Sequence, residues 1–128
     1  MATIPADKVD LFEKKTIAHL ATLLPNGAPH VTPVWIGYDA EAERILVNTE
    51  RGRRKERNVR RNPAVGLSMV DPDNPYRYLS VTGEVDDLTE EGARDHIDEL
   101  ARRYTGGDYD NPIETRRLIM RIRPDTVR

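Results

Sequence analysis

The tripeptide Pro25-Asn26-Gly27 constrains the fold of this chain more than any other feature of its sequence. It stands between two runs rich in strand-forming residues, 16–24 and 29–38. Asn and Gly tolerate the positive φ angles of tight hairpin turns, so the two runs are predicted to pair as antiparallel strands. Further strands are predicted where strand-forming residues cluster or alternate with polar ones, at 45–49, 64–70, 78–85 and 116–123.

Helices are predicted at three places around these strands. A short helix over 5–14 begins near Pro5. A longer helix begins at Thr89, with two glutamates in its first turn, and stops at Gly106. The third covers the basic segment 51–61, which an Asn-Pro pair closes because the residue before proline is disfavoured in the α region.

The loop between the fourth and fifth predicted strands has the sequence DPDNP. Its prolines and aspartates indicate a turn, and Asp71 and Asp73 are interpreted as solvated side chains. Six antiparallel strands in an open sheet would leave two bare edges, so closure into a small barrel is expected. With 128 residues, 38% of them hydrophobic, the chain is predicted to be one domain, 1–128, with a lean core.

Several classes of chemistry lack the residues that they need. The chain has no cysteine, which excludes disulfides and thiolate metal sites, and its three histidines are too far apart to predict another metal site. Neither serine lies in a nucleophile elbow, and no glycine-rich phosphate loop is present. No apolar run is long enough to span a bilayer, so a cytoplasmic protein without a membrane partner is expected. If the protein is an enzyme, a bound organic cofactor must supply the reactivity.

The basic segment 51–61, RGRRKERNVRR, contains seven of the 20 Lys and Arg residues and a single acid. Its charge of +6 leaves −8 on the other 117 residues, because the net charge is −2. A strand end followed by a helix start directs free backbone N–H groups at one point, where an anion is stabilised. Arg53 and Arg57 are one helical turn apart and Lys55 lies at the turn, so at least two cations can meet one phosphate. A solvated basic helix face is the plain alternative.

The same segment carries a resemblance to a known family. The string Lys55-x-x-Asn58-Val59-x-x-Asn62-Pro63, preceded by Arg53, resembles the phosphate-binding segment of the pyridoxamine 5'-phosphate oxidase-like (PPOX class) split-barrel superfamily. The supporting features lie along almost the whole chain: residues 17–23, the Asn26-Gly27 turn, Pro33-Val34-Trp35 and Val81-x-Gly83-x-Val85. Within the superfamily the chain most resembles the F420-dependent, flavin/deazaflavin oxidoreductases of the B type.

The resemblance implies a mainly β protein with helices: a six-stranded antiparallel split β-barrel that forms a homodimer, with cofactor sites at the subunit interface. The implied cofactor is the deazaflavin coenzyme F420, with FMN as the alternative. Arg53 and Lys55 would hold the phosphate, with Arg57 and Asn58 near it. The second and third strands would line the ring with Thr32, Pro33, Val34, Trp35, Val47, Asn48 and Thr49, and Tyr76 and Tyr78 would approach from the partner chain.

The function implied is transfer of a hydride between F420 and a small unsaturated or conjugated organic substrate. The ring would provide the hydride, so no catalytic residue of the chain is predicted. An FMN-binding protein similar to pyridoxamine 5'-phosphate oxidase and a non-catalytic flavin or haem carrier are the alternatives. A nucleic-acid-binding module is disfavoured, because the chain has one phenylalanine and an acidic remainder, and so lacks a stacking platform on which bases could lie.

Overall fold

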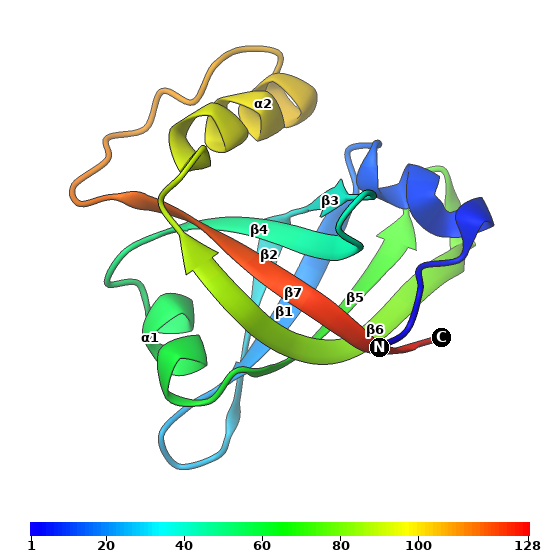
Figure 1. The fold of residues 1–128 in the computed structure, drawn as a ribbon. Coiled ribbons are helices and arrows are strands. Elements are labelled where there is room, and N and C mark those ends of the chain that lie inside the picture. The colour runs from blue at the N-terminus through cyan, green and yellow to red at the C-terminus, as the bar shows by residue number, and fades with distance from the viewer.

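Seven antiparallel strands form one strongly curled sheet in a computed structural model that describes residues 1–128 (Figure 1). Along the sheet the strands follow the order β2-β1-β5-β6-β7-β4-β3. Their bounds are β1 (Ile17–Leu23), β2 (Pro29–Trp35), β3 (Gly37–Asp39), β4 (Arg44–Glu50), β5 (Ala64–Asp71), β6 (Asn74–Thr89) and β7 (Arg117–Val127). The predicted class, a mainly β fold with helices and an antiparallel split barrel, is confirmed.

The predicted number of six strands is wrong, because the predicted second strand, 29–38, is two strands. β2 pairs with β1 over its whole length, whereas β3 pairs with β4 at the far end of the sheet. Between them lies Ile36, which is fully buried. Both segments are extended, so the two-residue alternation continues through the change of partner and hides it from a reading of the sequence.

The barrel core is closed at one end by a 3-10 helix, η1 (Ala6–Phe12), where a short helix is predicted. Leu11 and Phe12 of η1 are buried in the same apolar cluster as Leu20, Val47 and Met120 of the strands. Phe12 also stacks on Tyr38 of β3, with ring centroids 5.0 Å apart. The helix therefore acts as an apolar plug, and its two buried side chains each remove a large area from water.

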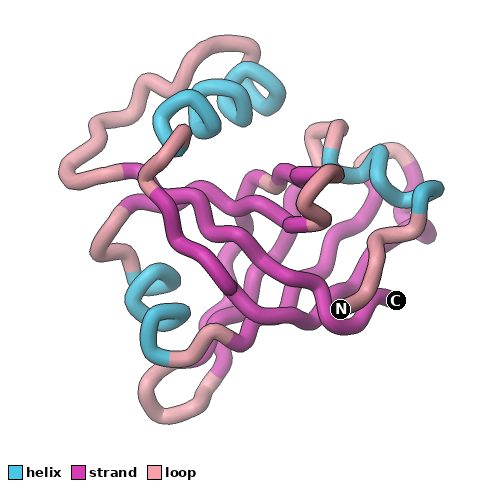
Figure 2. Tube along the Cα trace, viewed as in Figure 1, coloured by secondary structure: helices cyan, strands magenta, loops and turns pink.

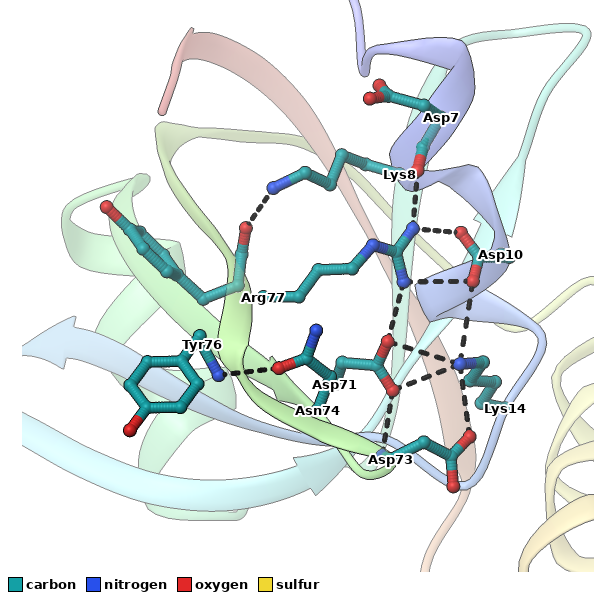
Figure 3. Close-up of polar contacts among 10 residues, drawn as sticks. Asp7, Lys8, Asp10, Lys14, Asp71, Asp73, Asn74, Tyr76 and Arg77 are labelled. Carbon is teal, nitrogen blue, oxygen red and sulfur yellow. Dashed lines mark hydrogen bonds and ion pairs between the residues drawn. The ribbon is translucent and has the colours of Figure 1, made fainter.

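A network of ion pairs fastens η1 to the β5–β6 hairpin (Figure 3). Arg77 of β6 donates to Asp71 at 2.7 Å and to Asp10 of η1. Lys14 lies 3.0 Å from Asp71 and 3.1 Å from Asp73. The backbone N–H of Asp73, together with Arg77 and Lys14, lowers the pKa of Asp71 to about 2. The interpretation of Asp71 as a solvated loop residue is therefore wrong, because its side chain is 4% exposed and joins two cations.

Two α-helices lie outside the curled sheet (Figure 2). α1 (Arg54–Arg61) follows β4, and α2 (Ala93–Thr105) lies between β6 and β7 and ends at Gly106, as predicted. The predicted start of the long helix at Thr89 is wrong, because β6 continues to that residue and pairs it with Ile119. The Thr89 hydroxyl instead accepts a hydrogen bond from the backbone N–H of Glu91 in the turn. Neither helix is long and apolar enough to cross a membrane.

Candidate functional site

A cleft of about 490 Å³ opens where β2, β4, the start of α1, α2 and the segment 106–116 meet. In Figure 1 this segment runs back from the end of α2 to the start of β7. The cleft is lined by Ile17, Pro33, Val34, Trp35, Asn48, Thr49, Glu50, Arg53, Lys55, Ile97, Leu100, Tyr109, Asn111 and Arg117. Seven of the predicted site residues are therefore brought together in the cleft: Pro33, Val34, Trp35, Asn48, Thr49, Arg53 and Lys55.

The start of α1 gives the cleft a cationic end. Arg53 is the N-cap residue of α1, and no side chain caps the helix. The backbone N–H groups of residues 54, 55 and 56 make no hydrogen bond to the preceding turn, so three donors remain free. Neither Arg53 nor Lys55 pairs with a carboxylate. Burial, and then the positive charges of Arg53 and Arg117, lower the pKa of Lys55. Free donors and unpaired cations at a helix start make an anion site.

The opposite part of the cleft offers a flat apolar wall. Trp35 stacks on Tyr104 of α2, with centroids 5.2 Å apart and the rings nearly parallel at 5°. Tyr109 meets the edge of Trp35 at 6.4 Å. The Tyr104 hydroxyl donates to the carbonyl of Thr16 and accepts the N–H of Ile36, so the stack is fixed to the sheet. A wall held in this way suits the face of a planar ring.

Two polar residues also line the cleft, Thr49 and Glu50. The Thr49 hydroxyl is buried and has no hydrogen-bond partner, which is costly unless a ligand supplies one. The Glu50 carboxylate, 7% exposed, accepts the backbone N–H groups of Glu114 and Thr115 at 3.3 and 3.2 Å. Glu50 therefore fastens the segment 106–116 to the end of β4, and this segment supplies the far wall of the cleft.

Two cleft residues of consequence, Tyr109 and Arg117, were not expected from the sequence. Arg117 is the first residue of β7, and its guanidinium lies over the Tyr109 ring at 5.1 Å. Burial is the largest cause that lowers the pKa of Arg117. Neither residue belongs to a motif, and they are brought to β4 only by the pairing of Arg117 with Glu50. No local pattern of the sequence could have found them.

Four of the predicted site residues lie on the barrel side of the cleft or beyond it. Val47 is fully buried in the core. The Asn58 amide, also fully buried, donates to the Thr22 hydroxyl of β1 at 3.0 Å and accepts from Arg61. Arg57 is exposed on the outside of α1. Thr32 lies on β2 outside the cleft lining, although its buried hydroxyl has no partner.

Tyr76 and Tyr78 lie on β6, away from the cleft of their own chain. Their side chains are 90% and 53% exposed. Lys8 of η1 lies over the Tyr78 ring at 5.7 Å and donates to its carbonyl. Figure 3 shows Tyr76 beyond the ion-pair network, on the strand that Arg77 fastens. The two tyrosines could reach a cleft only in another copy of the chain.

A family model described as Pyridoxamine 5'-phosphate oxidase matches residues 4–128. The chain belongs to this family. The resemblance found in the sequence is therefore confirmed, and the cleft described above is the candidate site of a pyridoxamine 5'-phosphate oxidase family member. A search of curated proteins gave no match.

Solved structures support the family assignment. A protein described as an F420 reductase is 35% identical to this chain, over 98% of each chain, with a TM-score of 0.84. A conserved hypothetical protein of Mycobacterium tuberculosis is 24% identical over 99% of this chain and 84% of that one, with a TM-score of 0.74. The HupZ protein of Group A Streptococcus is 17% identical over 98% of this chain and 92% of that one, with a TM-score of 0.66. The last two show the shared fold alone.

Proposed function

We propose that this family member is an oxidoreductase that binds coenzyme F420 in the cleft and transfers a hydride to a small unsaturated or conjugated organic substrate. The observation that carries the proposal is the composition of the cleft: unpaired cations and free N–H groups at one end, and a fixed aromatic wall at the other. A phosphate-bearing planar cofactor has these two parts. The 35% identical F420 reductase supports the choice of coenzyme.

The chain's own residues would bind and orient the cofactor. Arg53, Lys55 and the free N–H groups of α1 suit its phosphate, because charge-assisted hydrogen bonds are the strongest that a protein offers. Pro33 and Trp35 suit one face of its ring, and the unpartnered Thr49 hydroxyl suits a polar atom at the ring edge. When bound, the reduced ring supplies the hydride. The chain would position the ring and exclude water from one side of it.

Additional arginines near the start of α1 favour F420 over FMN. Arg51, Arg54 and Arg57 are exposed and form no ion pair with a carboxylate. A single phosphate has no use for them, whereas the carboxylate-bearing tail of F420 would extend past the phosphate into their field. FMN is the second candidate, because the resemblance to the pyridoxamine 5'-phosphate oxidase-like superfamily implies it as the alternative cofactor and Arg53 with Lys55 would satisfy one phosphate.

We also propose that a second copy of the chain covers the outer face of β1, β2, β5 and β6. The side chains on this face alternate with less exposed ones along each strand. From Tyr76 to Thr82 of β6 and along β1, β2 and β5 none of them is Asp, Glu, Lys or Arg, and the first charge is Glu84, further along β6. The exposed ones include Ile17, Val31, Val70, Tyr76 and Tyr78. A continuous uncharged face of this kind marks a protein interface. Ile17, Pro33 and Trp35 belong to both the face and the cleft, so a partner would border the cofactor site.

Titration of the purified apoprotein with F420 and, separately, with FMN tests the binding proposal. Trp35 is the only tryptophan and lines the cleft, so its fluorescence reports occupancy directly. Lys55→Ala is expected to weaken binding about tenfold or more, because it removes a charge-assisted contact. Lys15→Ala is the matched control, since Lys15 is exposed, forms no ion pair and lies outside the cleft. Equal affinities of the two variants would remove Lys55 from the site.

Single-turnover reduction of an α,β-unsaturated ketone by the protein loaded with reduced F420 tests the activity. If the coenzyme is oxidised faster with the protein than without it, the protein is an enzyme. Tight binding without turnover of any conjugated acceptor would favour a non-catalytic carrier instead. Tight binding of FMN with weak binding of F420 would overturn the choice of coenzyme.

Sedimentation velocity of Val31→Arg tests the interface. Val31 is 57% exposed on β2, the edge strand of the proposed face, and a charge there is expected to shift the protein toward the monomer. A wild-type protein that sediments as a monomer at micromolar concentration would refute the dimer.

A further inference from the structure

Arg117 is a cation without a counterion in the wall of the cleft. Its Nε donates to the Asn48 Oδ1 at 2.7 Å, and its guanidinium lies over the Tyr109 ring. No carboxylate lies within 4.0 Å of it. Its two terminal nitrogens make no hydrogen bond and are not enclosed by protein. A partly buried charge of this kind costs free energy that an anion in the cleft would offset.

Asn48 is fixed in one orientation by α2. Its Nδ2 donates to the carbonyl of Ala93 at 2.9 Å and contacts the Nδ1 of His96 at 3.0 Å. Reversing the amide would place its oxygen against the Ala93 carbonyl and its nitrogen against the Arg117 Nε, which are two contacts between like groups. The observed orientation therefore makes the His96 Nδ1 an acceptor, which requires a neutral imidazole protonated on Nε2.

His96 is held in place from its other side. It lines a second cavity, of about 340 Å³, with Gly37, Leu46 and Arg103. A Cβ on Gly37 would lie 3.2 Å from the His96 Nε2, so glycine leaves the imidazole the room that it needs. Burial lowers the pKa of His96 to about 4; Arg103 and Arg117 act in the same direction, and Glu99 opposes them. The imidazole is therefore neutral near pH 7 and remains an acceptor.

We propose that His96 and Asn48 are positioning residues that fix the Arg117 guanidinium in the cleft wall, and that Arg117 binds an anionic group, phosphoryl or carboxylate, of the molecule bound there. The inference rests on the proposed function in that the cleft holds an anionic ligand. It adds to that function a third cation, on β7, beside Arg53 and Lys55 of the β4–α1 connection. It also gives α2 a part in ligand recognition.

Two substitutions of His96 separate positioning from simple packing. His96→Asn puts an amide oxygen close to the position of the Nδ1 acceptor. His96→Leu removes the acceptor and fills the site with an apolar side chain. Arg117→Gln removes the charge itself. Arg117→Gln is expected to weaken binding of the ligand that uses this residue about tenfold or more. His96→Leu is expected to produce part of that loss, and His96→Asn to restore most of it.

A double-mutant cycle shows whether His96 acts through Arg117. In the Arg117→Gln background, His96→Leu is expected to cause no further loss of affinity. An equal loss of affinity in both backgrounds would overturn the proposal that His96 acts through Arg117. Weaker binding of F420 or FMN to Arg117→Gln assigns the anionic group to the cofactor. Unchanged cofactor binding with a raised KM for a carboxylate-bearing acceptor, but not for a neutral one, assigns it to the substrate. If neither changes, Arg117 is not a binding group.

A readout that needs no cofactor keeps the inference separate from the proposed function. The Nε–H of Arg117 is expected to give an exchange-protected ¹⁵N NMR signal that His96→Leu loses and His96→Asn keeps. Addition of inorganic phosphate to the apoprotein is expected to shift this signal. A wild-type protein that binds neither F420 nor FMN but shows both effects refutes the proposed function alone. An unprotected signal that phosphate does not shift refutes the inference.

Discussion

Acid is expected to destabilise this protein through His96 before most of its carboxylates titrate. Burial lowers the pKa of His96 to about 4 in the folded chain, against 6.5 in an unperturbed one. Between these values the unfolded chain binds the proton and the folded chain does not, so lowering the pH favours unfolding. The stabilisation is complete above about pH 6.5 and falls as the pH drops toward about 4.

The size of the effect follows from the two pKa values. The full difference corresponds to roughly 3 kcal/mol, and the part lost by pH 5 is about 2 kcal/mol. The structural cause is the geometry around the ring: a protonated Nδ1 would present its hydrogen to the Asn48 Nδ2, 3.0 Å away, and two arginines act on the same charge. The lost contact would also release Asn48 from its orientation toward Arg117.

Urea unfolding of the wild type and His96→Asn, at steps from about pH 7.5 to 5, measures the effect. The asparagine does not titrate, so the difference between the two free energies of unfolding is expected to shrink by about 2 kcal/mol as the pH falls. Other groups titrate in both proteins and cancel, and Asp71, with its pKa of about 2, stays ionised throughout. Parallel curves, or an NMR titration that places the His96 pKa above 6, would refute the reasoning.

Two further predictions concern the fold that holds the cleft. Gly83→Ala is expected to cost about 1–3 kcal/mol in urea unfolding, because its Cβ would lie 2.2 Å from the Arg123 carbonyl oxygen of the paired strand. Gly66→Ala is the control, since its Cβ would meet nothing closer than 3.9 Å, and an equal loss in both would contradict the steric argument. Asn58→Ala is expected to cost about 1–3 kcal/mol by leaving the Thr22 hydroxyl without its partner, and to leave cofactor affinity nearly unchanged. A large loss of affinity at unchanged stability would place Asn58 in the site after all.

The predicted and observed site residues differ at Asn58. Arg53 and Lys55 were predicted from adjacent residues, because a helix start and its cations are determined within a few positions of the chain. Asn58 belongs to the same string, yet its side chain turns inward to Thr22 of β1. The string specifies the helix, but which face of that helix meets the barrel depends on the sheet beneath it. Asn58 was therefore predicted near the phosphate only because it is close in sequence to Arg53 and Lys55.

Local chemistry was enough to predict much of the architecture. The Asn26-Gly27 turn, the alternating runs and the glycine stop at Gly106 each act over a few residues, so the strands, the antiparallel class and the end of α2 could be predicted from the sequence. The basic segment likewise identified the cationic end of the cleft.

Only the tertiary structure decided which distant residues meet. The ion pair of Asp71 with Lys14 and the contact of His96 with Asn48 join residues that are far apart in the chain, and the change of strand partner at Ile36 leaves no local signal. Such contacts depend on how the sheet curls and on where α2 packs, and neither is encoded in a local period. For the same reason Arg117 became a candidate binding group only when β7 was paired with β4.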